Sequence, residues 1–190
     1  MDWNSVDDLL KAMDSIEYVF LRNWDSIREA CEEGEDWDVL CLDKEAMVNI
    51  THAIPLNQHT DCYNFYTSVG GKKLLLDIRC VGDGYYDKPW EEVMIKNRVK
   101  TEGIYVLCKE DYNYSILYHA LLQKRERDGA KYNQMLRELF DESNKEKWIG
   151  NLAQFLIKKE YQLVLPLDEG VYINRRLYNQ LGEMMNGREN

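Results

Sequence analysis

Residues 35–42 read E-D-W-D-V-L-C-L, a short apolar run that contains two aspartates. Such a run is typical of a buried β-strand. Because residues i and i+2 of a strand point to the same face, Asp36 and Asp38 should project together. Trp37 and Val39 should then face the opposite side. This stretch therefore predicts a sheet that carries two carboxylates on one face.

A third carboxylate, Asp77, interrupts another apolar run, L-L-L-D-I-R. An aspartate in such a run is unfavourable unless it faces water, pairs with a cation or binds a metal. If the two strands are neighbours, the three acids lie together and raise each other's pKa, a strain that a divalent cation would relieve. Oxygen-only ligands are those that Mg²⁺ prefers. The alternatives are that the first two aspartates form a solvated strand face and that Asp77 pairs with Arg79 or Lys72.

Strand and helix patterns alternate through the first part of the chain. Gly70-Gly71, between two strand-like runs, predicts a hairpin with a tight turn. Ser5 and Asp43 are typical helix N-caps. The expected helices cover 5–14, 24–33, 44–52 and 90–98. The expected strands cover 16–22, 36–42, 61–69, 72–80 and 104–107. We therefore expect an α+β domain over residues 1–109, with a mixed sheet flanked by helices.

Helical patterns dominate the remaining residues, 110–190. The expected helices cover 111–125, 130–140 and 144–160. Asn174 is a candidate N-cap for a last helix. Before it, 162–166 and 171–173 could form a small hairpin around L-D-E-G. A chain of 190 residues fits one domain with an appended helical region, so we expect a helical C-terminal part after the α+β domain.

The composition limits the classes of partner. The chain has 34 acidic and 24 basic residues, a formal net charge of −10. A protein this acidic repels phosphate at long range, which argues against duplex nucleic acid and anionic membrane surfaces as partners. No run approaches the ~20 apolar residues that span a bilayer, and the N-terminal M-D-W-N-S-V-D-D-L-L lacks the features of a signal peptide. Five cysteines without a C-x-x-C pair favour reduced thiols, so we expect a cytoplasmic protein.

The strand segments resemble those of the polymerase-beta-like nucleotidyltransferase superfamily, and most closely those of small bacterial nucleotidyltransferase-like proteins. In that family a strand ends in a short loop and a helix follows. A second strand then carries D-h-D, with h apolar, and a later strand carries a third aspartate. The matching pieces are Y-V-F-L-R-N-W (18–24), D-W-D-V-L (36–40) and L-L-L-D-I-R (74–79). The resemblance covers about residues 15–109 and implies a nucleotidyltransferase-like sheet.

The resemblance also implies a chemistry for these residues. Asp36, Asp38 and Asp77 would hold two Mg²⁺ or Mn²⁺ ions. The ions would bind a nucleoside triphosphate and activate an acceptor hydroxyl for in-line attack on the α-phosphorus. Asp77 would lie closest to the acceptor, as its base or as a metal bridge.

The loop after the first strand departs from the family pattern. Most active members carry Gly-Ser or Gly-Gly there, whereas this chain has Arg22-Asn23-Trp24. Arg22 could bind a phosphate bidentately or pair with a nearby acid. Asn23 tolerates positive φ and can donate a hydrogen bond from its side chain. Arg22 and Asn23 are therefore candidate nucleotide-binding residues.

Other polar residues have both a functional and an ordinary interpretation. The G-D-G at residues 82–84 could belong to an acceptor-binding loop, although an ordinary turn also explains it. His119 could be catalytic or could pack within a helix. Lys124 and Arg125 suit the C-terminal end of a helix without any further role.

Three functions are consistent with the sequence. The leading hypothesis is a Mg²⁺-dependent nucleotidyltransferase that moves a nucleotidyl group from a nucleoside triphosphate to a hydroxyl of a small molecule, a sugar or a protein. The net charge argues against a nucleic-acid acceptor. The second hypothesis is a module of the same fold that binds or regulates without catalysis. The third is an interaction protein that assembles, for example as a homo-oligomer, through residues 110–190.

Overall fold

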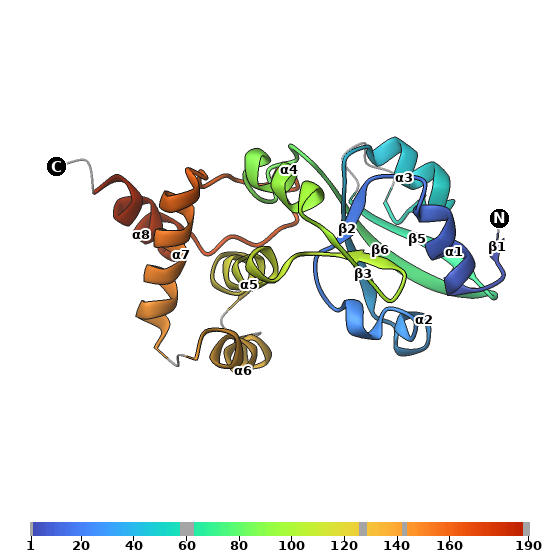
Figure 1. Cartoon of the computed structure of the whole chain (residues 1–190), viewed down its shortest axis with the longest axis horizontal. Helices are drawn as coiled ribbons and strands as arrows, with labels where there is room; N and C mark the ends of the chain where they lie inside the picture. Colours follow the sequence, from blue (N-terminus) through green and yellow to red (C-terminus); the bar gives the residue numbers. More distant parts are fainter. Residues whose placement is uncertain (1, 58–62, 126–128, 142–143, 188–190) are drawn as a thin grey trace.

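The computed structural model describes residues 2–57, 63–125, 129–141 and 144–187. Eight strands in these residues form one mixed sheet, with the order β1-β5-β6-β3-β2-β8-β7 and with β4 paired to β5 (Figure 1). The strands are β1 (Asp2–Trp3), β2 (Tyr18–Phe20), β3 (Asp36–Cys41), β4 (Ile54–Pro55), β5 (Asn64–Val69), β6 (Lys72–Cys80), β7 (Val99–Thr101) and β8 (Ile104–Val106).

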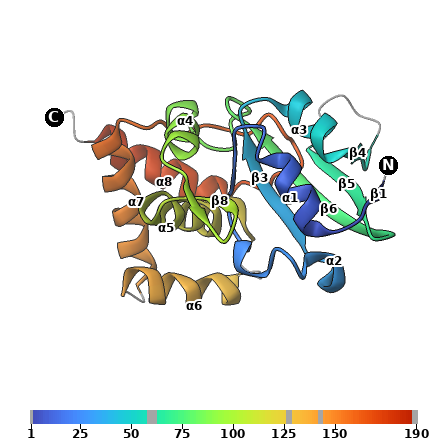
Figure 2. The same ribbon diagram turned by 45° about the vertical axis from the view of Figure 1, so that its right-hand side comes forward.

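Helices cover both faces of this sheet, so the structure confirms an α+β fold with a mixed sheet (Figures 1 and 2). The α-helices are α1 (Val6–Met13), α2 (Ala30–Glu33), α3 (Lys44–Thr51), α4 (Lys88–Lys96), α5 (Lys109–Tyr118), α6 (Gly129–Phe140), α7 (Lys145–Lys159) and α8 (Arg175–Asn186). A 3₁₀ turn, η1 (Trp24–Ser26), and a π-helical segment that continues α5, η2 (His119–Gln123), complete the elements. None of the helices described is long and apolar enough to cross a membrane.

Side-chain hydrogen bonds begin three of these helices where the sequence predicts N-caps. The Ser5 hydroxyl accepts from the backbone N–H of Asp8, and the Asp43 carboxylate accepts from that of Ala46. The Asn174 side chain likewise caps α8. Each bond satisfies one of the N–H groups that a helix leaves free at its start.

Buried apolar side chains form two clusters, one on each face of the sheet. Val39 belongs to the cluster under α1 and α3, whereas the next residue, Leu40, belongs to the cluster under α4, α5, α7 and α8. This division follows from the alternation of side chains along a strand. In the second cluster Trp90 of α4 stacks on Tyr161, which follows α7, with ring centroids 5.6 Å apart. Residues before and after 110 therefore share one core.

The register between β3 and β6 places two of the predicted carboxylates side by side. β3 and β6 pair in parallel, with Asp38 opposite Asp77. The expected β5–β6 hairpin is also present, and its pairing is antiparallel. Within that hairpin, residues 61–62 lie outside the described part of the chain. The sheet therefore brings the second and third predicted carboxylates together.

Two expected elements differ from the structure. The helix expected over 24–33 is split into η1 and α2, because the Ile27 carbonyl accepts from the Trp37 indole N–H, 3.0 Å away, instead of from a helical N–H. The hairpin expected between 162 and 173 is wrong, since no strand occurs in that described segment.

The segment that lacks the expected hairpin is bonded to other parts of the chain. The N–H of Gln162 donates to the Asp87 carboxylate, 2.9 Å away, and the N–H of Leu167 donates to the Asp83 carbonyl at the same distance. These bonds use backbone N–H groups that would otherwise be available to pair the two strands of a hairpin. The segment is consequently tied to the loop that follows β6.

That loop contains a glycine that no other residue can replace without strain. Gly84 has a φ of +76°, and a Cβ there would lie 2.6 Å from the carbonyl oxygen of Leu165. Gly84→Ala should therefore lower the free energy of unfolding by about 2–4 kcal/mol, through backbone strain and overpacking together.

Gly71→Ala is the matched control for Gly84→Ala. Gly71 has the same φ of +76°, but nothing lies within 4 Å of its added Cβ. This variant should lose only about 1 kcal/mol, from backbone strain alone. Urea denaturation measures both losses. Equal losses would contradict a role for the Leu165 contact in holding the loop.

Candidate functional site

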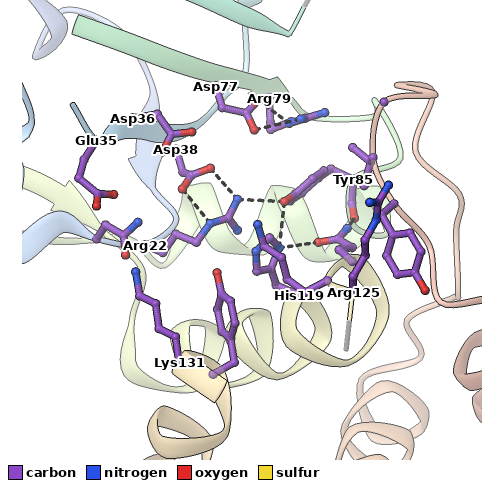
Figure 3. Close-up of a pocket in the computed structure, with 17 residues that line it drawn as sticks. Arg22, Glu35, Asp36, Asp38, Asp77, Arg79, Tyr85, His119, Arg125 and Lys131 are labelled. Atoms are coloured by element: carbon purple, nitrogen blue, oxygen red, sulfur yellow. Dashed lines mark hydrogen bonds and ion pairs between the residues drawn. The ribbon is translucent and has the colours of Figure 1, made fainter. Parts of the chain in front are cut away.

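A cavity of about 460 Å³ lies between the carboxylate-bearing face of β3 and β6 and the segment formed by η2 and the start of α6 (Figure 3). Its lining includes all five residues that the sequence singles out, namely Arg22, Asn23, Asp36, Asp38 and Asp77. The structure thus brings the predicted site residues to one place. Its volume lies in the range of small-molecule sites.

Arg22 neutralises Asp38 at the centre of the cavity wall. Its Nε and Nη2 donate to the two carboxylate oxygens of Asp38, over 2.8 Å and 2.6 Å. Both side chains are buried. A bidentate bond between opposite charges is the strongest type of hydrogen-bonded ion pair. The alternative in which Arg22 pairs with a nearby acid is therefore the one that the structure shows.

Asp77 has an equivalent partner in Arg79, two residues along the same strand. Arg79 Nε lies 2.8 Å from Asp77 Oδ1, and Nη2 donates to Oδ2 over 3.0 Å. Arg79 also reaches Asp168 in the segment before α8, over 3.0 Å. Burial raises the pKa of Asp77 to about 6, although Arg79 opposes the rise. Asp77 therefore ionises closer to neutral pH than an ordinary aspartate.

Asp36 is the most accessible of the predicted residues, and Asn23 is half-buried. Asp36 is exposed at the start of β3. Loss of hydration and the nearby Asp38 both raise the pKa of Asp36. Asn23 has a φ of +54°, the left-handed conformation that asparagine tolerates. It turns the chain from β2 into η1 beside the cavity.

A hydrogen-bonded network continues from Arg22 across the cavity wall (Figure 3). Arg22 Nη2 donates to the Tyr85 hydroxyl over 2.9 Å. The same hydroxyl lies 3.1 Å from His119 Nδ1, and Gln123 Oε1 lies 3.0 Å from that nitrogen. Gln123 Nε2 donates to the Tyr85 carbonyl, so its Oε1 faces the imidazole. This arrangement places the imidazole proton on Nδ1.

The second imidazole nitrogen of His119 has no hydrogen-bond partner among the described residues. Burial, reinforced by the charges of Arg22 and Lys124, lowers the pKa of His119, so the ring is neutral at pH 7. With its proton on Nδ1, the imidazole has a free lone pair on Nε2. His119 therefore lines the cavity and carries one buried nitrogen without a hydrogen-bond partner among the described residues.

The loop between β6 and α4 holds Tyr85 in this network. The Asp83 carboxylate accepts from the N–H groups of Cys80 and Tyr85. The Glu91 carboxylate of α4 accepts from those of Gly82 and Tyr86, over 2.7 Å and 2.9 Å. The glycine-rich segment is therefore a rigid turn that positions an aromatic side chain.

Three cationic side chains complete the lining on the far side from β3. They are Lys124 and Arg125, which follow η2, and Lys131 in the first turns of α6. In the part of the chain that the structure describes, none of the three pairs with a carboxylate. Sequence reasoning assigned Lys124 and Arg125 only to a helix end and did not single out Lys131. No local signal could have placed Lys131 near Asp36, since they are far apart in sequence.

The carboxylates do not form a metal site as they lie. Within the described residues, no group of three or more His, Cys, Asp or Glu side chains is arranged to hold an ion. The physical reason is that Arg22 and Arg79 already occupy Asp38 and Asp77. Three carboxylates are a donor set suited to Mg²⁺, but two of them would have to leave their arginines first.

Comparisons of the chain with protein-family models, with curated proteins and with solved structures find no match.

The buried Arg22–Asp38 pair yields a stability prediction. Arg22→Met should lower the free energy of unfolding by about 3–5 kcal/mol, because it leaves a buried carboxylate without a partner. The double variant Arg22→Met/Asp38→Leu should recover most of this loss, since no charge then remains buried. Urea denaturation checks both.

An exposed ion pair supplies the control for Arg22→Met. Arg28 Nε lies 3.0 Å from Asp7 Oδ1, and both side chains are largely exposed. Arg28→Met should therefore change the free energy of unfolding by no more than ~1 kcal/mol. If Arg22→Met costs no more than Arg28→Met, the buried pair does not hold the cavity wall.

Glu91 makes the stability depend on pH. Burial raises the pKa of Glu91 from an ordinary 4.5 to about 8. Between these values the folded state binds a proton that the unfolded state has lost. The stabilisation is complete below about pH 4.5 and should be lost as pH rises towards 8, by at most ~1.4 kcal/mol per pH unit. Urea denaturation at pH 7 and 8, above the pKa of about 6 of Asp77, measures this slope.

Glu91→Gln should flatten that slope, because the amide does not titrate. Glu92→Gln changes the exposed neighbouring residue of α4 and should leave the slope as in the parent protein. A parent-like slope in Glu91→Gln would show that another group titrates in this range.

Proposed function

We propose that the cavity binds a nucleoside triphosphate together with Mg²⁺ or Mn²⁺ and transfers its nucleotidyl group to a hydroxyl of a small molecule, a sugar or a protein. One observation carries the proposal. Asp38 and Asp77 lie opposite each other on parallel strands, with Asp36 on the same face, and Lys124, Arg125 and Lys131, which pair with no carboxylate among the described residues, line the other side of the same cavity.

The charge of the lining supports a polyphosphate ligand. The cavity is lined by four carboxylates, Glu35, Asp36, Asp38 and Asp77, and by five cationic side chains, so that the charges of the lining nearly cancel. This local balance contrasts with the −10 of the whole chain. A cavity focuses the field of the charges that line it. A triphosphate can therefore bind here although the protein repels anions at long range.

The residues of this chain have separate tasks in the proposed reaction. Lys124 and Lys131 bind phosphate oxygens of the triphosphate by charge-assisted hydrogen bonds. Asp77, which lies opposite Asp38, accepts the proton of the acceptor hydroxyl where it is not itself a ligand of the ion. The hydroxyl oxygen then attacks the α-phosphorus, and pyrophosphate leaves on the opposite side.

The ion's contribution is to neutralise phosphate charge and to orient the triphosphate. Before the ion can bind Asp38, Arg22 must release the Asp38 carboxylate. Before the ion can bind Asp77, Arg79 must release the Asp77 carboxylate.

The two arginine–carboxylate pairs also favour a second function. Each buried carboxylate is already neutralised by an arginine, so the folded protein needs no metal ion to stabilise these charges. This arrangement suits a module that binds phosphate without catalysis. This second proposal is a nucleotide-binding or regulatory module that uses the same cavity. It differs from the first in that its ligand binds without a divalent ion.

A thermal-shift experiment tests the two functions. Mn²⁺ with a nucleoside triphosphate at about 100 times its Kd should stabilise the parent protein by about 2.7 kcal/mol, which raises Tm by roughly 5–10 °C. Asp36→Asn should abolish the part of the shift that depends on the ion. Because Asp36 is exposed, this variant should keep the parent Tm in the absence of ligand.

Asp25→Asn is the control, since it removes an exposed carboxylate that does not line the cavity. It should bind as the parent does. A nucleotide shift that is the same with and without Mn²⁺, and the same in Asp36→Asn, would favour the binding module. The absence of a shift with every ion and nucleotide would contradict both functions.

A further inference from the structure

A second cavity adjoins the first one. It has a volume of about 210 Å³ and lies between η2, α6 and the start of α7, the last two of which are labelled in Figure 2. Lys124, Arg125 and Tyr132 line both cavities. The two spaces are therefore neighbours that share one wall.

The second cavity has a different charge from the first. Four cationic side chains line it, namely Lys124, Arg125, Arg137 and Lys145, and its described lining contains no carboxylate. Its apolar lining includes the buried Leu121, Leu136 and Trp148. Cations beside an apolar wall exert a stronger field than cations surrounded by water. An anionic group is the ligand that this lining suits.

The size of the second cavity limits what it can hold. Its 210 Å³ is below the roughly 300 Å³ at which complete ligand sites begin. It can therefore hold one end of a ligand, while the rest extends into the first cavity. Two arginines, Arg125 and Arg137, can each bind a phosphate with paired N–H donors, and a dianion matches several cations better than a single carboxylate does.

We propose that the acceptor is a phosphorylated small molecule, whose phosphate binds in the second cavity between Arg125 and Arg137 and whose hydroxyl faces Asp77 in the first. This inference rests on the proposed nucleotidyltransferase function, for which it names the acceptor class. The phosphate is retained in the product, and the hydroxyl at the other end of the molecule forms the new bond to the α-phosphorus.

Inorganic phosphate is the probe for this site. Titration calorimetry on the full chain should show phosphate binding to the parent protein, both alone and after saturation with Mn²⁺ and a non-hydrolysable nucleoside triphosphate. Binding to the saturated protein separates an acceptor phosphate from the phosphates of the nucleotide. Displacement of phosphate by the nucleotide would overturn the proposal, because the second cavity would then belong to the nucleotide site.

Arg137→Gln removes an arginine that lines the second cavity but not the first. Arg137 is exposed on α6, so its replacement should leave the fold intact. Phosphate should bind roughly tenfold more weakly, the loss expected for one hydrogen-bonded charge, while ion–nucleotide affinity stays within about twofold. Lys158→Gln removes the same charge from an exposed position on α7 that lines neither cavity. It should alter neither affinity.

The outcomes separate this inference from the function on which it rests. Parent-like phosphate binding in Arg137→Gln, or none in the parent, overturns the acceptor site even if the ion–nucleotide complex binds. Failure of the ion–nucleotide complex to bind overturns the transferase and with it the acceptor role. Phosphate binding that Arg137→Gln weakens would then identify an anion-binding site.

Discussion

The parallel pairing of β3 with β6 is the constraint on which the candidate site depends. Asp38 lies opposite Asp77 in this register, and the apolar neighbours of both residues face the core under α1 and α3. A slip of one residue would turn Asp77 into that core and bring Ile78 to the cavity, because the side-chain period of a strand is two. Burial of one face therefore fixes the position of the carboxylates.

The buried carboxylates in turn determine what surrounds them. A charge can be buried only with a partner, and Arg22 and Arg79 are those partners. Arg22 then connects Asp38 to Tyr85 and His119, so that the strand, the rigid turn after β6 and the π-helical segment form one network. A π-helical segment in such a position is frequent at functional sites. Lys124, Arg125 and Lys131, which pair with no carboxylate in the described part of the chain, line the opposite side of the cavity.

Features of the site that depend on residues close in sequence could be predicted, whereas features that depend on residues far apart in sequence could not. The shared face of Asp36 and Asp38 could be predicted because it depends only on strand periodicity. The Arg79–Asp77 pair remained one of two alternatives, since sequence separation of two allows it but does not require it. The hairpin before α8 was wrong because its backbone groups bond to the loop near Asp83. The position of Lys131 in the cavity lining could not be predicted from the sequence.

The sequence by itself determined the local features of this protein. Alternation of apolar and acidic residues set the faces of β3 and β6, and Ser5, Asp43 and Asn174 began their helices through bonds to nearby N–H groups. Only the tertiary structure decided that Arg22 neutralises Asp38 and that Lys124, Arg125 and Lys131 line the same cavity as the acids of the sheet. The physical reason is that these contacts join segments far apart in the chain. They form only when burial of both sheet faces brings those segments together.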